Sequence, residues 1–313
     1  MSSHSPADVP VRSALRTWAA RLAPWVIVVG VFVALARKYE PRAVLAQMAA
    51  GSWAGMLPLA LVMPFAYLVI NGVADTIVLR AVVGGPRYRD VLRGRAGTAV
   101  LMILGYVFGH GGFGMWLARK TGTKAPLATG TVLYTMTSDL AAIATMTTLA
   151  TRLGNTAGVP RAVLVTAPIV ALVLLALVLV GPLLLPDDTR SLFQPWRSVR
   201  PRSALAQIAM RVLNLSVLVT GVWIASRVFG LDIPIGPFAT YMPVILLVAS
   251  LPVSTFGFGA AQGAWLLFVP WATGEQLLAF QMLWSIFLGL GVLVRGLPFV
   301  PSVMREIRGP ASA

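Results

Sequence analysis

Cysteine is absent from this 313-residue chain, and histidine and acidic residues are scarce. Without cysteine the chain can form neither a disulfide framework nor a thiolate metal site. Its two histidines, His4 and His110, are too few for a histidine-based metal centre. The ten acidic residues include no cluster suited to Mg²⁺, and neither a Ser-His-Asp arrangement nor an HExxH motif is recognisable. We therefore expect no metal, no cofactor and no catalytic residues.

Apolar residues, by contrast, make up 58% of the chain and charged residues only 11%. A water-soluble protein of this size still needs a polar surface, so this composition indicates a membrane protein. We expect an all-α polytopic transmembrane helix bundle that forms a single domain over 1–313, with flexible tails at 1–16 and 309–313. Six segments are long and apolar enough to cross a bilayer: 17–37, 55–80, 126–150, 161–185, 204–228 and 274–296.

Two further apolar regions, 97–118 and 237–271, are interrupted by glycine and proline. We interpret them as broken or re-entrant elements, which brings the total to between six and eight crossings. Non-helical backbone at membrane depth requires protein or a water-filled cavity around it. Residues 40–52 are predicted to form a short interfacial helix that Pro41 opens.

The chain carries 25 Lys and Arg against ten acids, an excess that is also typical of nucleic-acid-binding proteins. We reject that function because the basic residues lie in short loops between apolar spans. Basic loops favour the cytoplasmic side, so we place both termini in the cytoplasm of the inner (plasma) membrane. The cytoplasmic loops then contain Arg80, Arg87, Arg89, Arg93, Arg95, Arg190, Arg197, Arg200, Arg202, Arg305 and Arg308.

The two interrupted regions resemble each other. The first contains Gly111-Gly112-Phe113-Gly114, and the second contains Phe256-Gly257-Phe258-Gly259. Each follows a long span and precedes another, so 55–150 and 204–296 have the same order of elements. With the orientation above the two units run antiparallel, which predicts an inverted repeat with its binding site at the repeat interface. The competing interpretation is that the glycines only permit close helix packing.

The segment from Leu251 to Gly259, Leu-Pro-Val-Ser-Thr-Phe-Gly-Phe-Gly, is followed by Gln262-Gly263. This pattern resembles the signature of the lysylphosphatidylglycerol synthase transmembrane region, or flippase-like, family. The first glycine segment, followed by a span that carries Asp139, is similar to that family's first-half motif. The resemblance covers roughly 20–300.

The resemblance implies movement of lipids between leaflets, such as aminoacylated phosphatidylglycerol, polyprenyl-linked sugars or hopanoid-type lipids. The family's aminoacyl-transferring enzymes also carry a soluble catalytic domain, which we do not find in this sequence. Relatives often have an acidic residue where this chain has Gln262, and another after Gly114, where it has Met115-Trp116. Tyr134 stands where a basic residue is common. These departures imply a different headgroup or a loss of transport.

Charged residues inside predicted spans are costly and usually face the bundle interior. Asp139 lies in the middle of 126–150, and Arg211, with Asn214 three residues later, lies within 204–228. We predict that Asp139 contacts Arg211, either as a structural ion pair or as part of a substrate site. Asp75, one turn after Asn71, reads more simply as a solvated or arginine-paired residue near a span end.

The glycine segments expose backbone N–H groups that favour phosphate, and Arg119 adds positive charge beyond the first of them. His110 either couples proton movement or is a hydrogen-bonded structural residue. The substrate-binding candidates are His110, Gly111, Gly112, Gly114, Arg119, Asp139, Arg211, Asn214, Ser254, Gly257, Gly259 and Gln262.

Three functions remain open at this point. The first is a flippase-like translocator of an anionic phospholipid or a polyprenyl-linked lipid across the bacterial inner membrane. The others are an integral-membrane lipid-modifying enzyme and a non-catalytic membrane scaffold or subunit. The expected partners are membrane lipids and no nucleic acid, with a homo-oligomer or a lipid-biosynthesis protein as further candidates.

Overall fold

The computed structural model describes residues 29–103, 106–154, 159–185, 191–250 and 260–308, and this part of the chain is helical without a strand. Residues 29–38 form the first described helical segment. The helices that follow are α2 (Pro41–Ala50), α3 (Trp53–Val83), α4 (Tyr88–Ala99), η1 (Val100–Ile103), α5 (Tyr106–Thr121), α6 (Ala125–Leu153), α7 (Arg161–Leu184), α8 (Gln194–Ser198), α9 (Pro201–Phe229), α10 (Ile235–Ala249), α11 (Ala260–Trp265), η2 (Leu266–Phe268), α12 (Gly274–Gly296), η3 (Leu297–Phe299) and α13 (Val300–Arg308).

Four helical segments are long and apolar enough to cross a membrane: Trp53–Val83, Arg161–Leu183, Pro201–Phe229 and Gly274–Arg308. They coincide with four of the six predicted spans, which confirms a membrane protein built as a helical bundle. The predicted span 126–150 is helix α6, but its frequent Thr and Ser keep it outside this group. Most of the predicted span 17–37 lies outside the described residues.

Several helix boundaries follow from local sequence. Proline stands in the first turn of α2, α6, α8 and α9, where its missing N–H costs no hydrogen bond. Helix α9 ends at Gly230, whose φ of 102° is accessible mainly to glycine. Thr273 caps α12 through a reciprocal capping box with Gln276. The predicted short helix at 40–52 is confirmed as α2.

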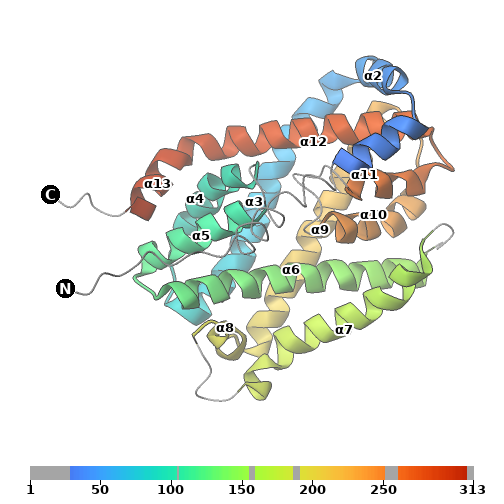
Figure 1. Ribbon diagram of the computed structural model, residues 1–313. Helices are drawn as coiled ribbons and strands as arrows, with labels where there is room; N and C mark the ends of the chain where they lie inside the picture. The colour runs from blue at the N-terminus through green and yellow to red at the C-terminus, as the bar shows by residue number, and fades with distance from the viewer. Residues whose placement is uncertain (1–28, 104–105, 155–158, 186–190, 251–259, 309–313) are drawn as a thin grey trace, which may run out of the picture.

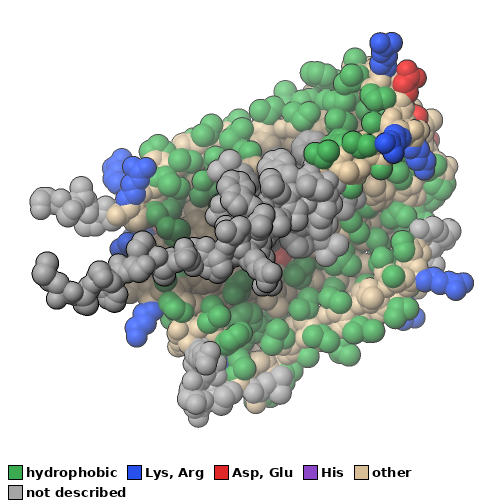
Figure 2. All heavy atoms as spheres, viewed as in Figure 1, with side chains coloured by type: hydrophobic (Ala, Val, Ile, Leu, Met, Phe, Trp, Pro, Cys, Tyr) green, Lys and Arg blue, Asp and Glu red, His purple; other side chains and the backbone are tan. Residues whose placement is uncertain are grey.

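The long helices pack side by side, and shorter helices lie between them (Figure 1). Helices α4 and α5 form a short hairpin in which η1 follows α4, and α13 packs against both helices. Helices α10 and α11 lie near the opposite end of the bundle. Figure 2 shows Lys and Arg gathered toward two ends of the visible face, with mostly hydrophobic side chains between them. This distribution suits a protein with an apolar belt.

The hairpin helices are shorter than a membrane is thick. Helix α4 has 12 residues and α5 has 16. At 1.5 Å per residue they measure about 18 and 24 Å, below the roughly 30 Å of the hydrocarbon core. Neither helix is therefore long enough to cross the hydrocarbon core by itself.

The structure corrects the position of the break in the first glycine segment. Gly111, Gly112 and Gly114 do not interrupt a helix but lie inside the continuous helix α5. The 3₁₀ segment η1 lies upstream of this helix and packs against it. A Cβ on Gly112 would lie 2.7 Å from Leu101 Cδ1, so the missing side chain lets α5 pack closely against η1. The competing interpretation, close helix packing, is the correct one for Gly112.

Gly111 provides a test of this helical assignment. Its φ is not positive, and a Cβ added to it would have no heavy atom of the described residues within 4 Å. We therefore expect Gly111→Ala to leave stability unchanged or to raise it by up to about 1 kcal/mol, because alanine favours the helix. The thermal unfolding midpoint in detergent measures the change. A clear loss of stability would show that this position needs glycine's backbone freedom.

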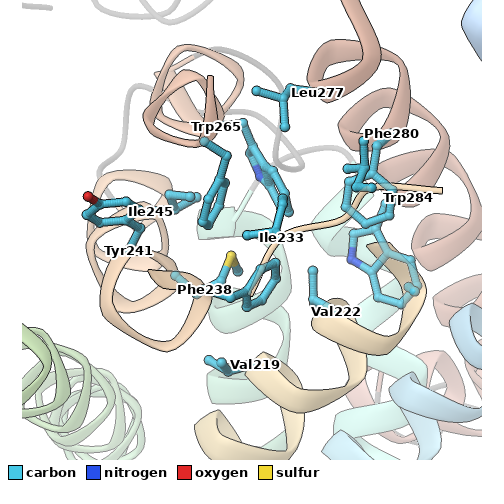
Figure 3. Close-up of a cluster of buried hydrophobic side chains, with 14 of the residues drawn as sticks. Val219, Val222, Ile233, Phe238, Tyr241, Ile245, Trp265, Leu277, Phe280 and Trp284 are labelled. Atoms are coloured by element: carbon cyan, nitrogen blue, oxygen red, sulfur yellow. The ribbon is translucent and has the colours of Figure 1, made fainter. Parts of the chain in front are cut away.

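An aromatic cluster surrounds α11 (Figure 3). Trp265 lies between α10 and α12, with its ring centroid 6.1 Å from that of Phe238 and 5.0 Å from that of Phe280. Phe238 also stacks on Phe268 at 5.2 Å. All four rings are buried, and they form part of the largest apolar core of the bundle. This end of the protein is therefore tightly packed around α11.

Candidate functional site

A cavity of about 240 Å³ lies in the interior where the first hairpin meets the long helices. It is smaller than the roughly 300–1,000 Å³ of typical drug-sized pockets, so it has room only for a small chemical group. Six helices contribute polar side chains to its wall: Asn71 and Asp75 of α3, Arg95 and Thr98 of α4, His110 of α5, Asp139 of α6, Arg211 of α9 and Arg295 of α12.

Asp75 is the centre of the ionic contacts in this cavity. One carboxylate oxygen, Oδ2, accepts a hydrogen bond from Arg95 Nε at 2.5 Å. The other, Oδ1, accepts one from Arg211 Nη2, also at 2.5 Å. Asp75 is only 1% exposed, so it contacts both cations away from solvent. A carboxylate at this depth is stable only with such partners.

Arg211 joins three helices through one guanidinium group. Besides Asp75 it contacts Asp139 of α6, with 3.1 Å between Nη1 and Oδ1. The same Nη1 donates to the side-chain carbonyl of Asn71, one turn before Asp75 on α3. The predicted contact between Asp139 and Arg211 is thus confirmed. The planar fork of arginine allows it to bridge several acceptors at once.

Arg95 connects the hairpin to the same group of charges. Its Nη2 donates to Thr135 Oγ1 of α6 at 3.4 Å, and its Nη1 lies 3.5 Å from His110 Nδ1. The guanidinium carbon lies 3.9 Å from the ring centroid of Phe113, in cation–π geometry. We call Asp75, Asp139, Arg95 and Arg211 the charged network. It couples α3, α6 and α9 to the short hairpin.

Arg295 lines the cavity from the other side, on α12. Its Nη1 donates to the backbone carbonyl of Pro64 in α3. Helix α12 can approach α3 this closely because Gly291, one turn earlier, has no side chain. A Cβ there would lie 2.5 Å from the Ala60 carbonyl oxygen and 2.7 Å from Pro64 Cγ.

The structure brings only some of the predicted site residues together. His110, Asp139 and Arg211 all line the cavity. Asn214 is buried one turn after Arg211, and its Oδ1 has no hydrogen-bond partner in the described part of the chain. Gly112 packs against η1.

The remaining candidates lie elsewhere. Gly111 and Arg119 are exposed on α5, and Gly114 is buried near Val132 of α6. Gln262 is buried beside a second, mostly apolar recess formed with residues of the 29–50 region and α12. Ser254, Gly257 and Gly259 lie outside the described residues.

Sequence reasoning missed three charged residues of the cavity. Asp75, expected near a span end with solvent or an arginine as its partner, does contact arginines, but it is deeply buried. Arg95, expected in a cytoplasmic loop, lies in α4 with a side chain only 14% exposed. Arg295 lies inside the predicted span 274–296, so a search for charges within spans would have found it.

Comparison with known proteins assigns this chain to no family. No family model matches this chain, and no curated protein matches it in sequence.

Proposed function

We propose that this chain is a flippase-like translocator that moves an anionic phospholipid or a polyprenyl-linked lipid across the bacterial inner membrane. The observation that carries the proposal is the charged network, because it lines a cavity inside a bundle of apolar helices. Charged groups at such depth generally mark a substrate or ion pathway. The resemblance of the 251–263 segment to flippase-like proteins supports the same function.

The hairpins support an inverted-repeat arrangement for this transporter. Helices α3 and α6 flank the hairpin α4–α5, and α9 and α12 flank the α10–α11 region in the same order. Short elements that enter from opposite faces place a binding site near the bilayer midplane, between the two repeats. The number of Arg residues around α4, α8 and α13 favours cytoplasmic termini and a cytoplasmic entrance for the first hairpin.

The contacts of Arg211 suggest how a headgroup could be accepted. Asp75 is 1% exposed and lies 2.5 Å from Arg211, whereas the Asp139 side chain is 25% exposed and lies 3.1 Å away. Asp139 is therefore the partner that an incoming anion displaces more easily. Both carboxylates contact arginine, which favours binding and conformational coupling over general acid–base chemistry.

A leaflet-sidedness assay tests the proposal. Purified protein is reconstituted into vesicles with a trace of acyl-labelled fluorescent phosphatidylglycerol, and a membrane-impermeant reductant bleaches the outer leaflet. We expect the wild type to expose inner-leaflet probe, so that bleaching exceeds that of protein-free vesicles. Arg211→Gln should abolish this excess because it removes the cation that bridges Asp75 and Asp139.

The matched control is Arg202→Gln, which removes an exposed arginine near the start of the same helix. It should translocate like the wild type. Equal bleaching with and without wild-type protein, for both labelled phosphatidylglycerol and labelled polyprenyl phosphate, would contradict a translocator.

A second candidate is a membrane scaffold without transport. The buried aromatic cluster around Trp265 favours it, because this side chain of α11 is packed among large rings. The same vesicle assay separates the two functions, since a scaffold leaves both lipids in their original leaflets.

A further inference from the structure

Among the described residues, one positive charge in the cavity has no carboxylate to balance it. Three arginines and two aspartates line the wall, and both aspartates pair with Arg95 or Arg211. In the described part of the chain no acidic oxygen lies within 4.0 Å of Arg295. We propose that Arg295 is the core of an anion site in this cavity, which takes a phosphate group on a ligand with net negative charge.

The burial of Arg295 makes its missing counter-ion significant. Arginine close to the end of an apolar helix normally extends its charge to the membrane interface. Arg295 precedes the last residue of α12, yet it is only 7% exposed. Because a guanidinium group does not lose its proton in proteins, this buried charge persists unless an anion neutralises it.

The hydrogen bonds of Arg295 leave donors available. Its Nη1 donates to the Pro64 carbonyl, while Nε has no partner in the described structure. Arg211, across the same cavity, also has an Nε without a partner. Buried donors without acceptors are costly, and guanidinium groups bind phosphate through paired N–H donors. A phosphate in the cavity would balance the charge of Arg295.

The backbone holds Arg295 in place before any ligand arrives. Gly291 brings α12 against α3 at Pro64, and the Pro64 carbonyl then orients the guanidinium toward the cavity. A binding group that is positioned in advance loses little conformational entropy when the ligand binds. The anion site rests on the proposed function, because it names the chemistry of the headgroup that the translocator would bind. Binding can nevertheless be measured without transport.

The test is a thermal-unfolding titration of the full-length protein in a neutral detergent. Three probes are added separately: short-chain phosphatidylglycerol, which is anionic, short-chain phosphatidylcholine, which is zwitterionic, and inorganic phosphate. We expect phosphatidylglycerol to raise the unfolding midpoint of the wild type saturably and phosphatidylcholine to have little effect. Arg295→Gln should require about tenfold more phosphatidylglycerol or show no shift, whereas Arg202→Gln should match the wild type.

The inorganic phosphate arm distinguishes the source of the anion. A shift with phosphatidylglycerol alone assigns the site to a lipid headgroup, and an equal shift with inorganic phosphate assigns it to free phosphate. The anion site is overturned if Arg295→Gln responds like the wild type, or if phosphatidylcholine is as effective as phosphatidylglycerol.

Asp139→Asn keeps the test decisive if Arg295→Gln does not fold. It removes a negative charge from the same cavity while Arg211 retains Asp75. We expect phosphatidylglycerol to bind about tenfold more tightly to this variant. Unchanged or weaker binding would contradict the proposal. Arg295-dependent binding without lipid movement in vesicles would reject the translocator while leaving the anion site intact.

Discussion

Replacing Asp75 by asparagine is expected to destabilise the bundle by about 3–5 kcal/mol, because it leaves the buried Arg211 and the largely buried Arg95 without their shared carboxylate. Arg95 and Arg211 both lie 2.5 Å from this residue. Arg211 would retain Asp139, but Arg95 has no second acidic partner among the described residues. The unfolding midpoint and the fraction of monodisperse protein in detergent measure the effect.

The neighbouring variants rank the ionic contacts. Asp139→Asn should cost much less than Asp75→Asn, because Arg211 keeps its shorter contact to Asp75 and its bond to Asn71. The double variant Asp75→Asn with Arg95→Gln should recover part of the loss, since it removes one unpaired charge. Equal destabilisation by Asp75→Asn and Asp139→Asn would show that Asp75 is not the centre of the network.

Gly291→Ala is expected to have the second-largest effect, a loss of about 1–3 kcal/mol through overpacking. The added Cβ would meet the Ala60 carbonyl oxygen at 2.5 Å, and that atom belongs to the backbone of α3. A backbone atom cannot rotate away as a side chain can, so α12 must move from α3. Arg295 lies one turn after Gly291 on α12, so that movement would also separate Arg295 from the Pro64 carbonyl of α3.

Gly111→Ala is the matched control for this substitution. Both variants add one methyl group to a helical glycine, but only Gly291 faces another helix closely. A midpoint for Gly291→Ala equal to that of Gly111→Ala would mean that α3 and α12 adapt to the extra volume. The phosphatidylglycerol response of Gly291→Ala should weaken together with its stability, because Arg295 loses its support.

Most of the helical framework could be predicted from the sequence. The apolar stretches at 55–80, 161–185, 204–228 and 274–296 became α3, α7, α9 and α12 with boundaries shifted by at most three residues. Hydropathy and length are properties of each segment by itself, and the bilayer thickness sets the length that matters. The structure of the glycine segment at 109–114 could not be predicted from the sequence, because glycine can either break a helix or permit close packing. The contact between Gly112 and η1 shows that it permits close packing here.

The candidate site could also be predicted only in part from the sequence. By itself the sequence determined that Asp139 and Arg211 are charges inside apolar spans and therefore need interior partners. It could not determine that Asp75, rather than Asp139, is the common partner, or that Arg95 belongs to the site at all. Asp75 lies 20 residues from Arg95 and 136 from Arg211 along the chain.

Only the tertiary structure decided which of these charges meet, because ion pairing depends on distances of a few ångströms between different helices. It also left Arg295 as the buried cation without an acidic partner among the described residues. The sequence determined that the protein lies in a membrane, which segments can span it, and that each buried charge is costly. The packing of α3, α4, α9 and α12 determined how that cost is offset, and where an anion would bind.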